Sequence, residues 1–143
     1  MLESGYVRKQ VLHMLQDAKR LATERRVLAA DADCDGTKIL NLVVAPVFKA
    51  VATALKTEGY KFRVVTPVGV VRLVSEASSD EFIEISLDVT REPPALIGGV
   101  SRRWGRRLLV DEIVIREFPE TADFSEQEVL DFLLKQVVPF VER

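Results

Sequence analysis

The stretch KFRVVTPVGVVRLVSEASSDEFIEISLDV, residues 61–89, decides the fold class of this chain. It contains three runs that are rich in Val, Ile and Phe with polar residues interleaved: residues 61–65, 69–74 and 81–89. Such runs are typical of β-strands. Residues 95–104 and 106–118 have the same character and turn at Gly105. The connections within this region are too short for parallel crossovers, which need a dozen or more residues, so we expect antiparallel neighbours.

A helix is expected after the last strand. Ser125 and Glu128 form a capping-box pair, in which Ser125 caps the helix and Glu128 reaches back to the backbone N–H of Ser125. Apolar residues at helical spacing follow. The pattern predicts a helix from Glu126 to about Val138, which Pro139 ends or bends.

Two helices are expected before the sheet. Apolar residues recur at helical spacing from about Tyr6 to Arg26, with charged residues between them. The acidic run Asp31–Thr37, which contains a Gly, is predicted to break this helix. A second apolar stretch, Ile39–Leu55, contains Pro46, which either kinks one helix or begins a shorter one; we favour one kinked helix.

These elements predict one α+β domain over residues 1–143. It has two N-terminal helices, an antiparallel sheet of about five strands in meander order, and a C-terminal helix packed on one face. The order of elements is similar to helix-grip and cystatin-like architectures.

Composition narrows the classes of function. The net charge is −2 over 143 residues, and neither half of the chain is strongly basic, so general nucleic-acid binding is disfavoured. Cys34 is the single cysteine, which excludes an internal disulfide. No signal-peptide pattern is present, and no apolar run approaches the length of a membrane span. We therefore expect a cytoplasmic protein that does not enter a membrane.

The sharpest local motif is the run DADCDGT, in which Asp31, Asp33 and Asp35 alternate before Gly36. Three carboxylates at this spacing are able to converge on Mg²⁺ or Ca²⁺ if the Gly permits a sharp turn. The run resembles the acidic motif of Toprim domains, the opening motif of haloacid-dehalogenase-type phosphatases and the first half of an EF-hand loop. The first two resemblances imply phosphoryl-transfer or nuclease-type chemistry. In the EF-hand register the twelfth position is Leu42 rather than Glu. The alternative interpretation is an acidic helix connection whose Asp side chains cap the next helix.

The second motif is a basic cluster with one aromatic residue: Arg102, Arg103, Trp104, Arg106 and Arg107. At a hairpin tip it is suited to bind an anion or a protein partner, because guanidinium groups match carboxylates and phosphates. It is equally consistent with a solvated tip that prevents edge-to-edge association. A third possibility is pairing, within a chain or between copies, with six downstream acids: Glu117, Glu120, Asp123, Glu126, Glu128 and Asp131.

No catalytic constellation emerges from the sequence. His13 is the only histidine, which excludes a multi-histidine metal site and leaves little for a Ser-His or Cys-His pair. The leading hypothesis is therefore a non-catalytic interaction or scaffold module that self-associates, for example as a homodimer, with the sheet and the Arg hairpin as its surface and an uncovered apolar face or strand edge as the contact. Two alternatives stay open: a divalent-cation domain that uses the DADCDG run, and a small-molecule site between the sheet and the C-terminal helix, lined by Phe132, Val137 or Phe140.

Overall fold

The computed structural model describes residues 1–142 and shows the expected α+β fold. The N-terminal helical region comprises α1 (Ser4–Ile39), the π-helical turn η1 (Leu40–Val44) and α2 (Ala45–Thr57). Five strands follow, β1 (Phe62–Val65), β2 (Val70–Ser75), β3 (Phe82–Asp88), β4 (Ala95–Trp104) and β5 (Arg107–Glu117). The chain ends with α3 (Glu126–Val141). All five strands pair antiparallel in the order β1-β2-β3-β4-β5, as the meander prediction requires.

The acidic run does not break the first helix, so this prediction is wrong. Residues 31–37 lie inside α1, which continues to Ile39. Gly36 does not form a turn, but it allows α1 to pack closely on the sheet. A Cβ atom at this position would lie 2.6 Å from Cδ1 of Leu87 on β3. Helix interiors accept Asp at a modest cost, and burial of the neighbouring Ala32 against the sheet offsets that cost.

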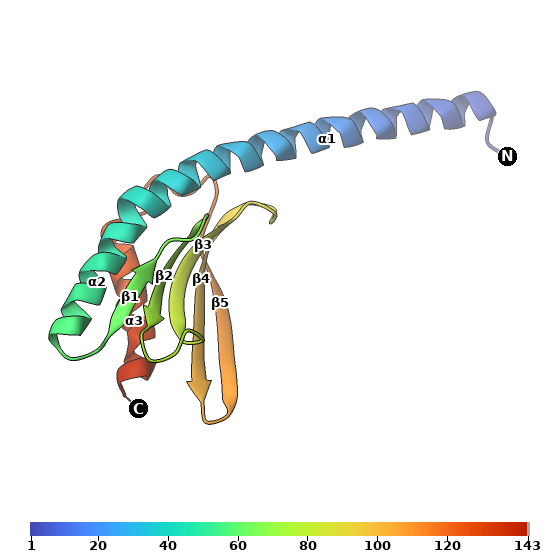
Figure 1. The fold of residues 1–143 in the computed structure, drawn as a ribbon. Helices are drawn as coiled ribbons and strands as arrows, with labels where there is room; N and C mark the ends of the chain where they lie inside the picture. Colours follow the sequence, from blue (N-terminus) through green and yellow to red (C-terminus); the bar gives the residue numbers. More distant parts are fainter. Residues whose placement is uncertain (143) are drawn as a thin grey trace.

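Pro46 lies in the first turn of α2, directly after η1. Proline has no N–H to donate to the carbonyl four residues earlier, and its ring collides with that carbonyl. The π-helical turn absorbs this mismatch, and the N–H of Ala45 donates to the carbonyl of Leu40 instead. The helix is therefore continuous but bent here (Figure 1), which agrees with the favoured kinked helix.

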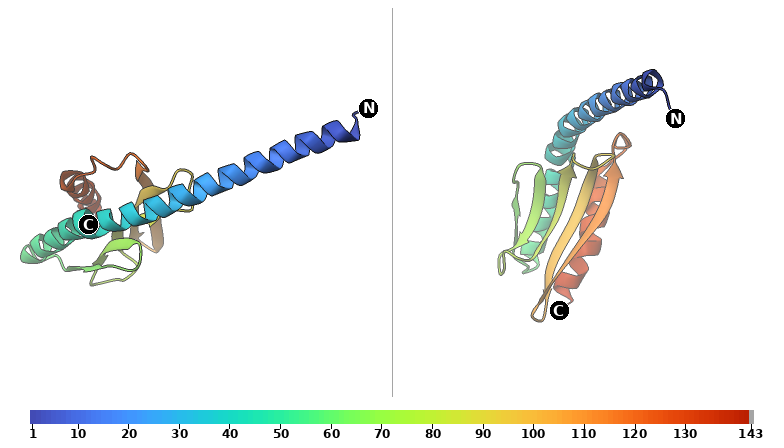
Figure 2. Two further views of the ribbon diagram at one scale, coloured as in Figure 1. Left: turned by 90° about the horizontal axis from the view of Figure 1, so that it is seen from above. Right: turned by 90° about the vertical axis from the view of Figure 1, so that its right-hand side faces the viewer.

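The core lies between the sheet and two helices, α2 and α3, which cover the same face (Figure 2). It contains Phe48, Leu73, Ile83, Ile85 and Leu133, each fully buried. The strand β4 leaves room for α3 by means of a glycine. A Cβ atom at Gly98 would lie 2.7 Å from the ring of Phe132, so the ring fills the space above that residue.

The C-terminal helix begins as predicted and ends later. The Ser125 hydroxyl accepts a hydrogen bond from the backbone N–H of Glu128, at 3.4 Å. The reciprocal half of the capping box is wrong, because the Glu128 carboxylate binds Arg116 on β5, with 2.6 Å between Oε1 and Nη2. Pro139 lies inside α3, which extends past it to Val141.

The expectation that no apolar run approaches the length of a membrane span is wrong. The helical stretch Ser4–Thr57 contains an 18-residue window with a mean hydropathy of 1.6, sufficient by length and composition to cross a membrane. In the fold, 28% of that window is buried, and the same stretch supplies core residues such as Val44 and Phe48. Core helices of soluble proteins and membrane-spanning helices both reach this hydropathy.

Candidate interaction surfaces

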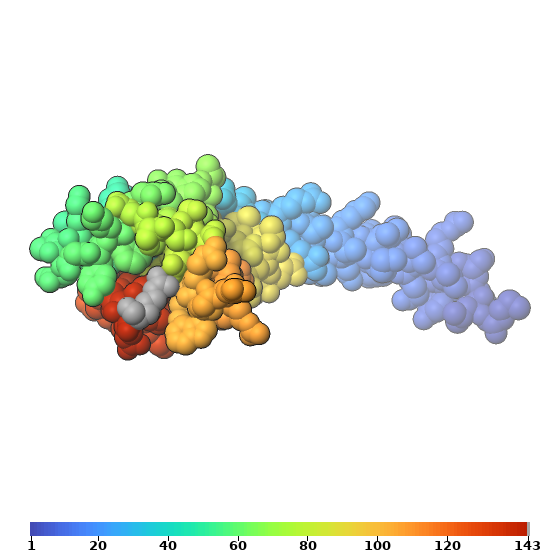
Figure 3. Space-filling view, turned by 60° about the horizontal axis from the view of Figure 1, so that its bottom comes forward, coloured from blue at the N-terminus to red at the C-terminus, as the bar shows by residue number. Residues whose placement is uncertain are grey.

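The most conspicuous surface is the projecting part of α1, residues 4–28, which we call the arm. It extends away from the sheet and from α2 and α3 (Figures 1 and 3). Large apolar side chains along it are 42–55% exposed: Val7, Val11, Met14, Leu15 and Leu21. These residues recur every three or four positions, so they share one face of the helix together with Ala18. We call this face the arm stripe.

The arm stripe continues the face by which α1 packs on its own sheet. Ala32 and Gly36 are buried, and Gly36 lies against Leu87. Counting back from Ala32 in steps of three or four residues leads through Ala29, Arg25 and Ala22 to Ala18, so this face is apolar except at Arg25. The body therefore covers only the C-terminal end of one long apolar face. Arg25 marks the boundary, where it forms an ion pair with Glu92 of the β3–β4 connection.

The second exposed surface is the edge strand β5. It pairs with β4 on one side, and its opposite side is the end of the sheet. Residues 107–114 are exposed, because α3 covers only the later part of the strand. Three consecutive apolar residues in this part are Leu108, Leu109 and Val110, which are 48%, 37% and 63% exposed. A long apolar edge of this kind is a template for another strand.

The structure brings the predicted basic cluster to the tip of the β4–β5 hairpin. Trp104 is 64% exposed, and Gly105 takes the positive φ of 64° that the two-residue turn needs. The Arg102 guanidinium lies 5.7 Å from the Trp104 ring centre, and Arg103 forms an ion pair with Asp80. Arg106 and Arg107 make no ion pair within the described part of the chain. Whether the cluster binds an external anion or partner stays a prediction.

We call the six acids between Glu117 and Asp131 the acidic strip. Its ion pairs in the described part of the chain join it to Arg116, and the tip's ion pair joins Arg103 to Asp80. The base that serves the strip is Arg116, which sequence reasoning did not single out. It contacts Glu128 at 2.6 Å and Asp123 at 3.9 Å. The hydrogen bonds that Arg116 donates to Glu128, and the nearby acidic charges, raise the pKa of Arg116 above its ordinary value. The sequence did contain a signal for this role, because Arg116 directly precedes the run of six acids that begins at Glu117.

The three predicted cation ligands lie on the continuous helix α1, and all are exposed. Two residues of a helix turn through about 200°, so Asp33 points away from the side that Asp31 and Asp35 share. Among residues 1–142, no group of three or more His, Cys, Asp or Glu side chains is placed to hold a metal ion. Cation binding by this segment therefore stays an untested prediction.

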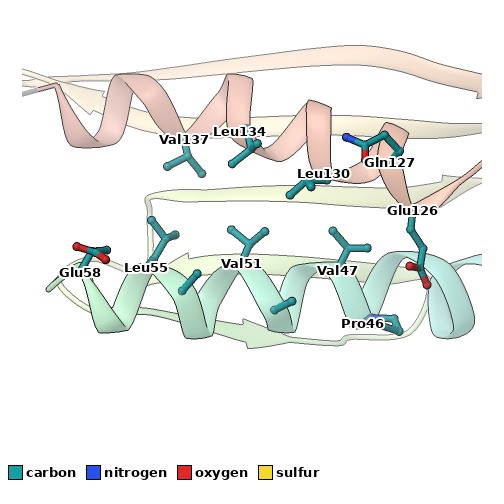
Figure 4. A pocket seen from close by; sticks show the side chains of 12 residues that line it. Pro46, Val47, Val51, Leu55, Glu58, Glu126, Gln127, Leu130, Leu134 and Val137 are labelled. Carbon is teal, nitrogen blue, oxygen red and sulfur yellow. The ribbon is translucent and has the colours of Figure 1, made fainter.

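An open apolar groove of about 540 Å³ lies between α2 and α3. Figure 4 shows Val47, Val51 and Leu55 of α2 facing Leu134 and Val137 of α3 across it. A glutamate lies toward each end, Glu58 and Glu126. Of the predicted lining residues, Val137 lines this groove, which opens between two helices and not between a helix and the sheet. His13 and Cys34 are both exposed on α1.

Comparison of the chain with known protein families, with curated proteins and with solved structures finds no match.

Proposed function

We propose that this protein is a non-catalytic interaction module that self-associates through its arm stripe. The observation that carries this proposal is a projecting helix of about seven turns. Its apolar face is exposed over the part that lies N-terminal to Arg25. Exposed apolar stripes on helices are characteristic of helix–helix contacts. A second copy of the arm offers a stripe of the same length and width.

The position of the body favours an antiparallel pair. In a parallel pair, the partner helix would lie on the stripe side at the level of Ala32 and Gly36, where the chain's own sheet already packs. An antiparallel partner avoids this clash, because its body lies at the opposite end. No residue on the stripe side of α1 is fully buried from Val7 to Ala29, so we place the twofold axis near the midpoint of this span, Ala18.

The antiparallel arrangement also gives the partner's N-terminus a place to lie. Pairing about Ala18 puts Val7 of one copy opposite Ala29 of the other. At that level α1 forms a cleft with the β3–β4 connection, lined by Arg25, Arg26, Leu28, Ala29 and residues 89–94. Leu2, which is 69% exposed in the single chain, is able to reach this cleft.

The test is the oligomeric state of a stripe variant, measured by sedimentation velocity over a range of concentrations. Val11→Glu with Ala18→Glu places two charges in the stripe, and we expect loss of arm-mediated association. The matched control is Gln16→Glu with Thr23→Glu, which adds the same two charges on the opposite side of the arm. The control should behave as the unmodified protein does. Equal behaviour of the two variants would overturn the proposal.

A second candidate function is binding of a neutral or cationic apolar molecule in the groove between α2 and α3. It is favoured by the opposed apolar side chains and by the glutamates near the two ends. Ala50 lines the groove, and Ala50→Phe would fill part of it. Apolar ligands found by thermal-shift screening should lose their effect in this variant, whereas Thr53→Phe on the exposed side of α2 should retain it.

A further inference from the structure

The free edge of β5 has a pattern that is complementary to itself. Side chains alternate between the two faces of a strand, so residues 107, 109 and 111 of β5 share one face and residues 108, 110 and 112 share the other. When two copies of a strand pair antiparallel about a twofold axis, each residue faces one of the same parity. Only a few registers are therefore possible, and each has a defined set of opposing residues.

One register matches every pair. With the axis at Leu109, the two Leu109 residues lie opposite each other, and Leu108 faces Val110 of the second copy. On the same basis Arg107 faces Asp111. Each heterotypic pair occurs twice, so the register contains two pairs of opposite charge around an apolar centre. Directly opposed charges and apolar residues are the pairs that stabilise antiparallel strands.

The neighbouring registers are poor. An axis at Asp111 or at Glu112 places two like charges in direct opposition, and an axis at Arg107 does the same with two guanidinium groups. An axis at Val110 sets Leu108 against Glu112 and Leu109 against Asp111, and an axis at Leu108 sets Arg107 against Leu109. The charges on this edge thus select one register, where uniformly basic edges repel every register.

The single chain leaves these groups available. Within the described residues, Arg106, Arg107, Asp111 and Glu112 have no ion-pair partner, and all four are exposed. The hairpin tip extends beyond the other strands (Figure 1), so two tips are able to overlap with the bodies at opposite ends. In this arrangement Arg107, at the start of β5, faces an acid of a second copy rather than the acidic strip of its own chain.

We propose that β5 is a second self-association surface, which pairs with β5 of another copy antiparallel about Leu109 and joins two five-stranded sheets into one. It is separate from the arm stripe and does not depend on it. A molecule with two different self-complementary surfaces does not stop at a dimer, because each copy leaves one surface free for the next. The two surfaces together build assemblies larger than a dimer: a closed one where the two twofold axes intersect, or a chain of alternating arm and strand contacts where they do not.

The register is tested by cysteine cross-linking in a Cys34→Ser background, where no native thiol remains. Opposed residues of antiparallel strands have Cα atoms about 4.5–5.5 Å apart, within the range of a disulfide. Leu109→Cys should therefore give a covalent dimer on mild oxidation. Val114→Cys is the matched control, because Val114 is on the same strand and similarly exposed, at 40%, but has no copy of itself opposite. Equal cross-linking of the two variants would contradict the register.

The charge pairs are tested by a swap, with sedimentation velocity in the Val11→Glu, Ala18→Glu background to remove arm contacts. Arg107→Asp places an acid opposite Asp111 of the other copy in both pairs, and it should weaken the strand dimer at least tenfold. Adding Asp111→Arg restores opposite charges in both pairs and should restore dimerisation. The control Arg63→Asp, on the other edge strand β1, should have no effect. A monomeric parent in this background would refute the β5 proposal without affecting the arm proposal. Failure of the swap to rescue would refute the register.

Discussion

Gly36 allows α1 to pack closely on β3 because it has no side chain. A Cβ atom at this position would lie 2.6 and 2.7 Å from the two δ-carbons of Leu87. We expect Gly36→Ala to destabilise the protein by about 1–3 kcal/mol, because overpacking outweighs the gain in helix propensity. Urea denaturation measures this. Gly5→Ala, at an open position of the same helix, should be neutral or slightly stabilising, and Leu87→Ala should relieve the effect of Gly36→Ala. A stable Gly36→Ala protein would mean that α1 does not pack this closely on β3.

Asp88, at the end of β3, predicts a pH dependence. Hydrogen bonds from the side chain and backbone of Thr90 lower the pKa of its carboxyl below the ordinary 3.8. A group whose pKa is lower in the folded state stabilises the fold above its unfolded pKa, and this contribution is lost as pH falls through the folded value. Asp88→Asn should therefore be less stable than the parent at pH 7, with a smaller difference at pH 3. Chemical denaturation at the two pH values decides, and a constant difference would exclude this linkage.

The three aspartates of the acidic run predict the response to divalent cations. Only Asp31 and Asp35 share a side of α1, and two carboxylates on an exposed helix make a weak site. We expect the thermal unfolding midpoint to be the same with Mg²⁺, Ca²⁺ or EDTA, for the parent and for Asp33→Asn. A midpoint increase that is present in the parent and absent in Asp33→Asn would restore the cation hypothesis.

At the scale of the elements, the arm predicts a pattern of cross-links in the Cys34→Ser background. In an antiparallel pair about Ala18, only Ala18 faces its own copy, so Ala18→Cys should give a covalent dimer and Val7→Cys should not. A parallel pair would cross-link both variants. Mixing Val7→Cys with Ala29→Cys should give a heterodimer, which distinguishes antiparallel pairing from failure of the arms to meet.

The strands could be predicted from the sequence because alternation is a local property. Each of the five runs between residues 61 and 118 contains its own evidence for a strand. The extent of α1 could not be predicted, because an Asp-rich run with a Gly has the same local signal in a turn and in a helix. What decides between them is Leu87 on β3, about fifty residues away, against which Gly36 packs.

The candidate surfaces also divide into features with a local sequence signal and features that depend on distant contacts. The basic cluster was found from the sequence and lies on the hairpin tip as expected, but the pairing of its residues across the sheet, Arg102 with Leu109 and Arg103 with Leu108, depends on strand register. Glu128 fitted a capping box locally, and Arg116 competes for it in the folded chain. The arm stripe was visible as an apolar period from Tyr6 onward. That it projects beyond the body follows only from where the sheet lies.

For the whole molecule, the arm and the body should be separable. The arm has no buried residue before Ala32 among those described, so deletion of residues 1–21 removes exposed helix and no core contact. The shortened protein should retain the sheet and a cooperative unfolding transition. Association of native copies raises the apparent stability by mass action. The midpoint of the full chain should therefore rise with protein concentration, and that of the shortened chain should rise less, with only the β5 surface left. Calorimetry from about 5 to 500 μM would show this. Identical concentration dependence for the two proteins would mean that the arm contributes nothing to assembly, and that β5 or a different partner carries the interaction.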